Sequence, residues 1–266
     1  MKLTMLGTGN ALVTECYNTC FVLSENGRHF LVDGGGGNGL LRQLKHTGIR
    51  PREISDIFVT HRHTDHITGI FWMLRQFARK GPPGAPKRGV NIYSHAEVIH
   101  ILHTIAELLF PGRDGDGIRE NVRFIEVADG ETKTILGRNV TFFDIRSVKA
   151  TQFGFCMELD NSRKLTFCGD EPYNECERPY AENSTWLLHE AFCLEAEAER
   201  YQPHRMKHST VKDACELAEQ LGVQNLLLYH TEDQNINDRK QLYTQEGKQF
   251  FHRNLFVPED LEEIDL

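Results

Sequence analysis

Residues 60–66, Thr-His-Arg-His-Thr-Asp-His, place four metal-ligand side chains within six positions. His61 and His63 lie two residues apart, so both rings project to the same side of an extended segment. Asp65 and His66 follow directly, and the apolar run before the cluster predicts a buried strand that ends there. Imidazole and carboxylate ligands suit Zn²⁺ or Mn²⁺ and leave coordination positions for water. The cluster therefore predicts a metal-hydrolase site, and the alternative is a solvated polar loop.

The length and composition predict a single domain over residues 1–266, since 266 residues with 39% hydrophobic content can bury a sizeable core. No apolar run approaches the about 18–20 residues of a membrane-spanning helix, and the first residues do not resemble a signal peptide. The seven cysteines are scattered without a Cys-x-x-Cys pair. That pattern predicts reduced thiols in a cytoplasmic protein. The lack of a spanning apolar run predicts no membrane partner.

The net charge of −8 argues against a protein that works mainly by wrapping nucleic acid. The segment Arg75–Arg88 is a local exception, because it carries five basic residues and no acidic one. Within it, residues 81–86 predict an irregular loop. This segment could steer a phosphate-bearing substrate, and a solvated loop is the alternative.

Hydrophobic periodicity predicts strands and helices in both halves of the chain. The predicted strands are residues 3–6, 20–23, 30–32, 57–59, 90–93, 122–127, 140–145, 153–159, 165–168, 186–189 and 225–229. The predicted helices are residues 40–46, 67–80, 97–109 and 211–220, the last capped by Ser209 or Thr210. The acidic tail, residues 258–266, is expected to fray. Two strand-rich halves predict two sheets packed face to face with helices outside.

Asp33 and the four glycines after it form a turn between a predicted strand and a predicted helix. Such a turn could cradle phosphate, but it has neither a Walker lysine nor a Gly-x-Gly-x-x-Gly context. We interpret it as a close backbone approach to a neighbouring active site, with Asp33 at the strand end.

Candidate residues in the second half lie at the ends of predicted strands. Taken alone, Asp170 would be interpreted as a turn aspartate and His230 as a locally hydrogen-bonded histidine. They become candidate metal ligands because the first cluster needs further ligands to complete a metal site. His208 opens a predicted helix and could donate a proton to a leaving group. Glu190 could orient that histidine, although 18 residues separate the two and spacing does not establish the role.

In their order along the chain, these motifs resemble the metallo-β-lactamase superfamily, and more specifically its ribonuclease Z and phosphodiesterase branch. Residues 60–69 match the defining motif of the superfamily. The segments 189–191, His-Glu-Ala, and 208–210, His-Ser-Thr, narrow the resemblance to this branch. Further similar segments are residues 6–9, 32–35, 153–155, 169–170 and 228–230. The resemblance implies a four-layer αββα sandwich.

The resemblance also implies a metal centre with one or two Zn or Mn ions per chain. It assigns His61 and His63 to one ion, Asp65, His66 and His230 to the second, and Asp170 to both.

Two departures from the family pattern matter. A third histidine for the first ion is missing, because residues 144–152 contain none and Arg146 or Val148 would occupy its position. The first site would then be weak, empty, or completed by water or by a distant histidine such as His95 or His204. The long arm of transfer-RNA-processing members is also missing, since only residues 156–168 lie in its place. With the acidic charge, this argues against transfer-RNA 3′-processing as the main activity.

The resemblance implies a metal-dependent phosphodiesterase, in which Asp65 orients a metal-activated water, His208 protonates the departing oxygen and Glu190 holds that histidine. The substrate would be a small molecule that contains a phosphodiester, or a nucleic-acid end, and the chain could form a homodimer. Two alternatives stay open. One is a thioester, ester or lactam hydrolase on the same fold. The other is a weakly catalytic binding or regulatory relative with an impaired first metal site.

Overall fold

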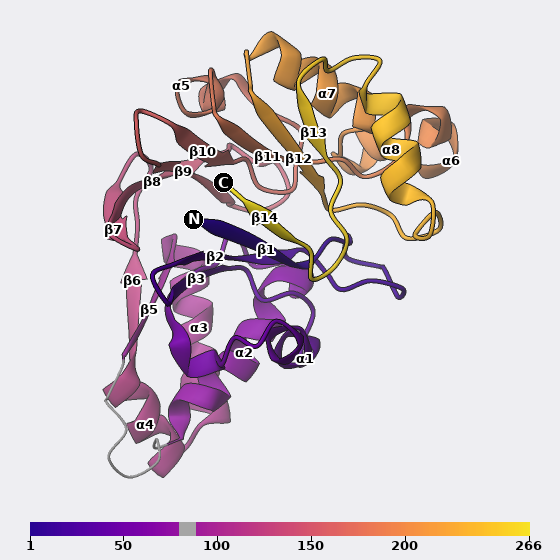
Figure 1. Cartoon of the computed structure of the whole chain (residues 1–266). Helices are drawn as coiled ribbons and strands as arrows, with labels where there is room; N and C mark the ends of the chain where they lie inside the picture. Colours follow the sequence, from indigo (N-terminus) through magenta and orange to yellow (C-terminus); the bar gives the residue numbers. More distant parts are fainter. Residues whose placement is uncertain (80–88) are drawn as a thin grey trace. The chain divides into compact units, whose positions relative to one another are not determined.

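The computed structural model describes residues 1–79 and 89–266 and divides into two compact units (Figure 1). The first unit contains residues 1–7, 18–127 and 261–266, and the second contains residues 8–17 and 128–260. Each unit has one seven-stranded sheet and its own helices, which confirms the mixed α/β class. A single domain over residues 1–266 stays a prediction.

The sheet of the first unit has the order β14-β1-β2-β3-β4-β5-β6. Its strands are β1 (Lys2–Gly7), β2 (Cys20–Glu25), β3 (Arg28–Val32), β4 (Ile54–Phe58), β5 (Val90–Ser94), β6 (Val122–Glu126) and β14 (Glu263–Asp265). Its helices are α1 (Gly39–His46), η1 (Pro51–Glu53), α2 (Thr64–Ala78), α3 (Ala96–Leu109) and α4 (Arg113–Asn121). Strands β3 to β6 are parallel, so their carboxyl ends lie at one edge of the sheet.

The C-terminal tail does not fray, so that expectation is wrong. Strand β14 pairs antiparallel with β1, with Ile264 opposite Leu3. The Ile264 side chain is buried, and an ion pair between Lys2 and Glu263 closes the same pair of strands. Pairing with the strand edge of β1 and the burial of Ile264 order a segment whose acidic composition predicts fraying.

The sheet of the second unit has the order β13-β12-β11-β10-β9-β8-β7. Its strands are β7 (Thr132–Ile135), β8 (Arg138–Asp144), β9 (Phe153–Glu158), β10 (Lys164–Phe167), β11 (Trp186–Glu190), β12 (Asn225–Tyr229) and β13 (Asn254–Phe256). Its helical segments are η2 (Glu175–Glu177), α5 (Arg178–Ala181), η3 (Glu195–Glu197), α6 (Ala198–Tyr201), η4 (Pro203–Met206), α7 (Val211–Gln220) and α8 (Arg239–Gly247). Strands β10 to β13 are parallel, and this brings the residues after β10, β11 and β12 to one edge.

Helix α7 begins as its sequence predicts. Thr210 is its N-cap, and its hydroxyl accepts a hydrogen bond from the backbone N–H of Asp213, whose carboxylate accepts one from the backbone of Thr210. Such a capping box stabilises a helix by about 1 kcal/mol. The apolar face of α7, with Val211, Ala214 and Ala218 fully buried, packs in the core of the second unit. The position of His208, just before this helix, is therefore well defined.

The basic segment Arg75–Arg88 is only partly described. Arg75 lies in α2, where its guanidinium donates to Asp114 at 2.9 Å. Residues 80–88, with the predicted loop at 81–86, lie outside the described residues. Among the helices that the structure describes, none is long and apolar enough to cross a membrane.

Candidate active site

The histidine-rich motif of the first unit lies where β4 ends and α2 begins. His61 and His63 stand in the connecting loop, with His63 as the N-cap of the helix, and Asp65 and His66 occupy the first helical turn. The side chains of His61, Asp65 and His66 are buried. The structure therefore brings these four predicted ligands together within one unit. The helix starts three residues earlier than its periodicity predicts, because the ligands themselves form its polar first turn.

Asp33, at the end of β3, holds two of these histidines. Its Oδ2 atom accepts a hydrogen bond from His66 Nδ1 at 2.7 Å and another from the hydroxyl of Thr60 at 2.8 Å. That hydroxyl lies 2.8 Å from Nδ1 of His61. Since a hydroxyl has one hydrogen, and Thr60 gives it to Asp33, the imidazole of His61 must donate from Nδ1. In both histidines the Nε2 lone pair is thereby left to bind a cation.

Burial raises the pKa of Asp33, while the ion pair with His66 and the hydrogen bonds from Thr60 lower it. Asp33 also has a left-handed backbone, with φ of 58°, which turns its carboxylate towards the start of α2. The glycines after it permit a close approach of the two segments. The backbone N–H of Gly69 donates to the carbonyl of Gly35 at 2.9 Å, and a Cβ on Gly69 would overlap the carbonyl oxygen of Gly34. This contact confirms the predicted close backbone approach, and the active site beside it stays a prediction.

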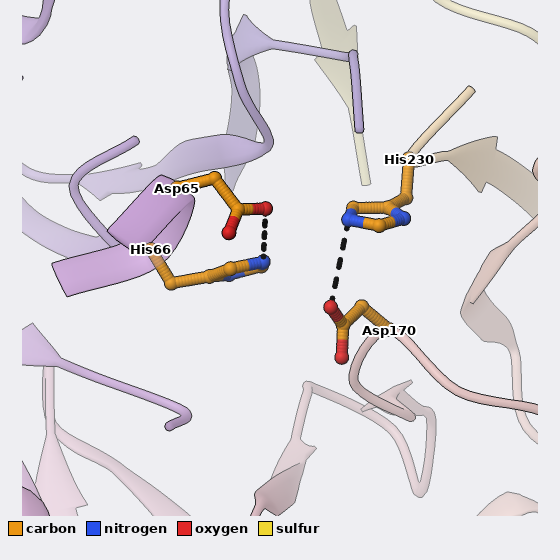
Figure 2. A group of neighbouring side chains, drawn as sticks. All are labelled: Asp65, His66, Asp170 and His230. Carbon is orange, nitrogen blue, oxygen red and sulfur yellow. Dashed lines mark ion pairs between the residues drawn. The ribbon is translucent and has the colours of Figure 1, made fainter. Parts of the chain in front are cut away.

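The donor atoms of the first unit fit a metal ion. The Oδ2 atom of Asp65 lies 3.2 Å from Nε2 of His66 (Figure 2). Nε2 of His61 lies 2.8 Å from Nδ1 of His63. Neighbouring ligand atoms around a tetrahedral zinc lie about 3.4 Å apart, given ligand distances of about 2.1 Å. The Asp65–His66 separation is close to this value, and the His61–His63 separation is shorter. Imidazole and carboxylate donors suit Zn²⁺ or Mn²⁺.

In the second unit, the parallel strands β10 and β12 place Asp170 and His230 at the same sheet edge. His230 Nε2 lies 3.5 Å from Asp170 Oδ2 (Figure 2), which is again a spacing that two ligands of one cation would have. His230 directly follows β12 and has a φ of 60°, and the Tyr229 hydroxyl before it donates to the carbonyl of Gly169. These backbone constraints fix both side chains at the strand ends.

Glu190 and His208 meet at this edge as well, although their spacing in sequence gave no indication of it. Glu190 ends β11 and is fully buried. One of its oxygens accepts from the backbone N–H of Ser209, and the other lies 3.5 Å from Nδ1 of His208. The ring of His208 stacks on Phe192, with centroids 5.2 Å apart and an interplanar angle of 17°. Its centroid also lies 5.2 Å from that of His230. A buried carboxylate behind a histidine is the arrangement of an oriented proton donor.

The segment that lacks the third histidine provides no replacement for it. Arg146 is exposed and forms ion pairs with Asp129 and Asp144, and Val148 is exposed. His204 pairs with Asp213, and neither it nor His95 belongs to a cluster of ligand atoms in the part of the chain that the structure describes.

Sequence reasoning missed Gln152, whose amide donates to Asp170 Oδ1 at 2.5 Å. It also missed Thr60 as the relay between Asp33 and His61. Neither residue type signals a site by itself. The one signal for Gln152 is its contact with Asp170, and the one signal for Thr60 is its contact with Asp33. Both aspartates lie at strand ends.

A hollow of about 480 Å³ adjoins His208 within the second unit. His208 and His230 are among the residues that line it. Phe192, Tyr201 and the partly exposed Met206 contribute apolar surface. The hollow is large enough for a small organic group next to His208.

Comparison with known proteins places this geometry in context. The model of the family described as Anti-Pycsar protein Apyc1 matches residues 1–255. Ribonuclease Z of Bacillus cereus (strain G9842) is 25% identical, over 94% of this chain and 95% of the relative. Among solved structures, the metallo-β-lactamase fold protein YhfI from Bacillus subtilis has a TM-score of 0.78 at 18% identity, with 99% of each chain covered. The human short-form tRNase Z has a TM-score of 0.76 at 20% identity, with 100% of this chain and 99% of that chain covered.

The structural matches confirm the predicted metallo-β-lactamase fold, and the ribonuclease Z match supports the predicted branch of the superfamily. The prediction of a hydrolase agrees with these relatives. The family model spans nearly the whole chain, and the chain therefore belongs to the Anti-Pycsar protein Apyc1 family.

Proposed function

We propose that this chain is a metal-dependent phosphodiesterase that acts on a small molecule with a phosphodiester, or on a nucleic-acid end. The observation that carries the proposal is the buried Glu190 carboxylate 3.5 Å from Nδ1 of His208. This pair stands beside the ligand candidate His230 and opens onto the hollow of the second unit. A proton donor with room for a leaving group is what hydrolysis of a diester with a poor leaving group requires.

The metal is Zn or Mn in this proposal, with one or two ions per chain. Its proposed ligands are His61, His63, Asp65 and His66 of the first unit and Asp170 and His230 of the second. The spacing of the donor atoms within each unit supports this ligand set. When bound, the metal supplies positive charge and lowers the pKa of a coordinated water towards about 7.

The chain's own residues then have separate tasks. The carboxylate of Asp65 accepts a hydrogen bond from the attacking water and orients it. His208 gives a proton to the departing oxygen, and Glu190 stabilises the positive charge on the ring before that transfer. Phe192 fixes the plane of the ring by stacking on it.

Two features make transfer-RNA 3′-processing a weaker proposal. Residues 156–168 form no more than a hairpin, with the end of β9, strand β10 and a turn closed by a hydrogen bond from the backbone N–H of Leu159 to the carbonyl of Arg163. The net charge of −8 also disfavours the binding of a long, negatively charged phosphate backbone. The nucleotide part of a substrate is therefore expected to be short.

The proton-donor role is tested by the leaving group. We expect His208→Ala to lower the hydrolysis of an alkyl phosphodiester by about 10²–10⁴-fold. A p-nitrophenyl diester should suffer much less, since p-nitrophenolate departs without a proton. His252→Ala is the matched control, because His252 also faces a carboxylate at 3.5 Å but is exposed. Equal losses on both substrates would mean that His208 is not the proton donor.

Location and assembly are further parts of the proposal. None of the seven cysteines forms a disulfide in the part of the chain that the structure describes, which supports a reducing compartment such as the cytoplasm. A homodimer stays a prediction that light scattering of the purified chain would check.

A further inference from the structure

We propose that Lys149 is an additional phosphoryl-binding residue of this active site, in the segment 144–152 that lacks the third histidine. The inference rests on the proposed phosphodiesterase function and names a residue to which the family resemblance gives no role. It concerns a fixed positive charge held beside His208.

Lys149 stands at the tip of a short, well-held loop. The loop is closed at its base by a hydrogen bond from the backbone N–H of Ile145 to the carbonyl of Gln152. Inside it, the hydroxyl oxygen of Ser147 accepts from the backbone N–H groups of Lys149 and Ala150. These bonds define where the Lys149 side chain starts.

The loop is also tied to the strand end that carries Asp170. The hydroxyl of Ser147 donates to Glu171 Oε1 at 2.7 Å, and this glutamate is buried. The ammonium of Lys149 lies 3.7 Å from the same oxygen. Glu171 thus attracts the ammonium without hydrogen-bonding to it, because 3.7 Å exceeds a donor–acceptor distance.

The Lys149 ammonium is directed at the proton-donor histidine. Its Nζ atom lies 3.4 Å from Nε2 of His208, the nitrogen on the side opposite Glu190. An ammonium has three hydrogens, and this long contact is the only hydrogen bond of Nζ within residues 1–79 and 89–266. The side chain is 26% exposed, so a solute can reach it.

The ammonium favours an anion placed between Lys149 and His208. A phosphoryl oxygen placed there would accept from both Lys149 and His208. The segment that carries Lys149 lacks the third histidine of the family pattern. A lysine there supplies positive charge instead of a metal ligand, because a compact ammonium binds phosphate as a point charge. We infer that Lys149 neutralises the charge on the phosphoryl group that builds up during hydrolysis.

The test compares Lys149→Met and Lys149→Arg with Lys133→Met. Lys133 is a matched control, since it is similarly exposed and ion-paired with Glu131 in the same unit. Three quantities are measured on the metal-loaded full chain: kcat and KM for a phosphodiester, the affinity for inorganic phosphate by calorimetry, and the zinc content by elemental analysis.

We expect Lys149→Met to lose about 10²-fold in kcat/KM, the usual effect of removing one group that stabilises developing negative charge. Its phosphate affinity should fall, with zinc content and melting temperature unchanged. Lys149→Arg should recover part of both losses, and Lys133→Met should equal the unmodified chain. A small primary amine added to Lys149→Ala should restore some activity.

The outcomes separate this inference from the proposed function. If the unmodified chain hydrolyses phosphodiesters and Lys149→Met matches it in kcat/KM and phosphate affinity, the inference is overturned and the function stands. If Lys149→Met loses zinc together with activity, the residue is structural and the inference again fails. If the unmodified chain cleaves no phosphodiester, the proposed function fails, and weaker phosphate binding by Lys149→Met would still support an anion-binding lysine.

Discussion

The carboxylate of Asp33 accepts a hydrogen bond from Nδ1 of His66 at 2.7 Å. Through the Thr60 hydroxyl it also sets the tautomer of His61. One buried side chain from the end of β3 thus orients two ligand candidates that follow β4. Such partners behind a metal-binding histidine raise the basicity of the ligand and fix its ring.

Replacement of Asp33 should weaken metal binding without emptying the site. We expect Asp33→Asn to lower zinc affinity by about 10–100-fold, because the amide still fills the space but carries no charge. Competition with a chromophoric chelator measures this. Asp56→Asn is the control, since Asp56 is an equally buried carboxylate on β4 that binds Asn91 and Tyr93. A similar loss in both variants would show a general effect of burial and contradict the account.

Neutralising Glu190 should slow the chemistry while leaving the fold intact. In Glu190→Gln the side-chain oxygen can still accept from Ser209, but the negative charge facing His208 is gone. We expect kcat on an alkyl phosphodiester to fall by about 10²–10⁴-fold with zinc content unchanged. Glu219→Gln removes the exposed carboxylate at 3.5 Å from His252 and should have no effect. An unaltered kcat in Glu190→Gln would exclude the carboxylate from the mechanism.

The tight contact of the glycine-rich turn with α2 predicts a cost for any side chain at Gly69. A Cβ there would overlap the backbone of Gly34. We expect Gly69→Ala to lower the free energy of unfolding by about 1–3 kcal/mol, as overpacking does, with a parallel loss of zinc affinity. Urea denaturation measures the first quantity. Gly89→Ala is the control, because the nearest atom to its Cβ would be 3.4 Å away. Equal stability of the two variants would contradict the described packing.

Glu177 should make stability depend on pH. Burial raises its pKa from 4.5 to about 8, and its Oε1 atom accepts from the backbone N–H of Asn174. Between these pH values the folded chain keeps the proton and the unfolded chain has lost it. This carboxyl therefore makes the free energy of unfolding fall as pH rises, by up to about 1.4 kcal/mol per pH unit, and its effect levels off above the folded pKa.

Glu177→Gln should remove this pH dependence. The free energy of unfolding of the variant should therefore rise relative to that of the unmodified chain between pH 5 and pH 8. Urea unfolding at a series of pH values, with chelator present in all samples, gives the difference. Glu175→Gln is the control, since Arg178 lowers the pKa of this exposed carboxyl. A Glu177→Gln difference that is constant across the pH range would show that Glu177 is ionised in the folded chain.

Much of the fold was predictable where apolar periodicity was strong. Helix α7 and strand β12 begin and end at the predicted residues. Helix α8 was missed because its sequence is polar and buries only Arg239, Tyr243 and Gly247. Helix α4 was missed because it contains two glycines, which have low helix propensity. Tertiary packing stabilises both helices, and local sequence does not encode that packing.

The parts of the candidate site that lie close together in the sequence were predictable, and the parts that only the fold brings together were not. His61, His63, Asp65 and His66 share one short motif, so their grouping follows from spacing alone. Glu190 and His208 meet only because the loop before α7 bonds back to the end of β11, with the backbone N–H of Phe192 donating to the carbonyl of Ser209. The spacing of Glu190 and His208 in the sequence does not predict that contact. The resemblance to a known family predicted the pairing of these two residues.

The central claim is tested most directly by the hydrolysis of a phosphodiester and of a thioester, assayed side by side with the metal-loaded chain. The account predicts that diester turnover exceeds thioester turnover. It also predicts that diester turnover is abolished by chelation, is restored by Zn²⁺ or Mn²⁺, and is absent from Asp65→Ala and Asp170→Ala. Faster thioester turnover, or diester turnover that survives chelation, would contradict it.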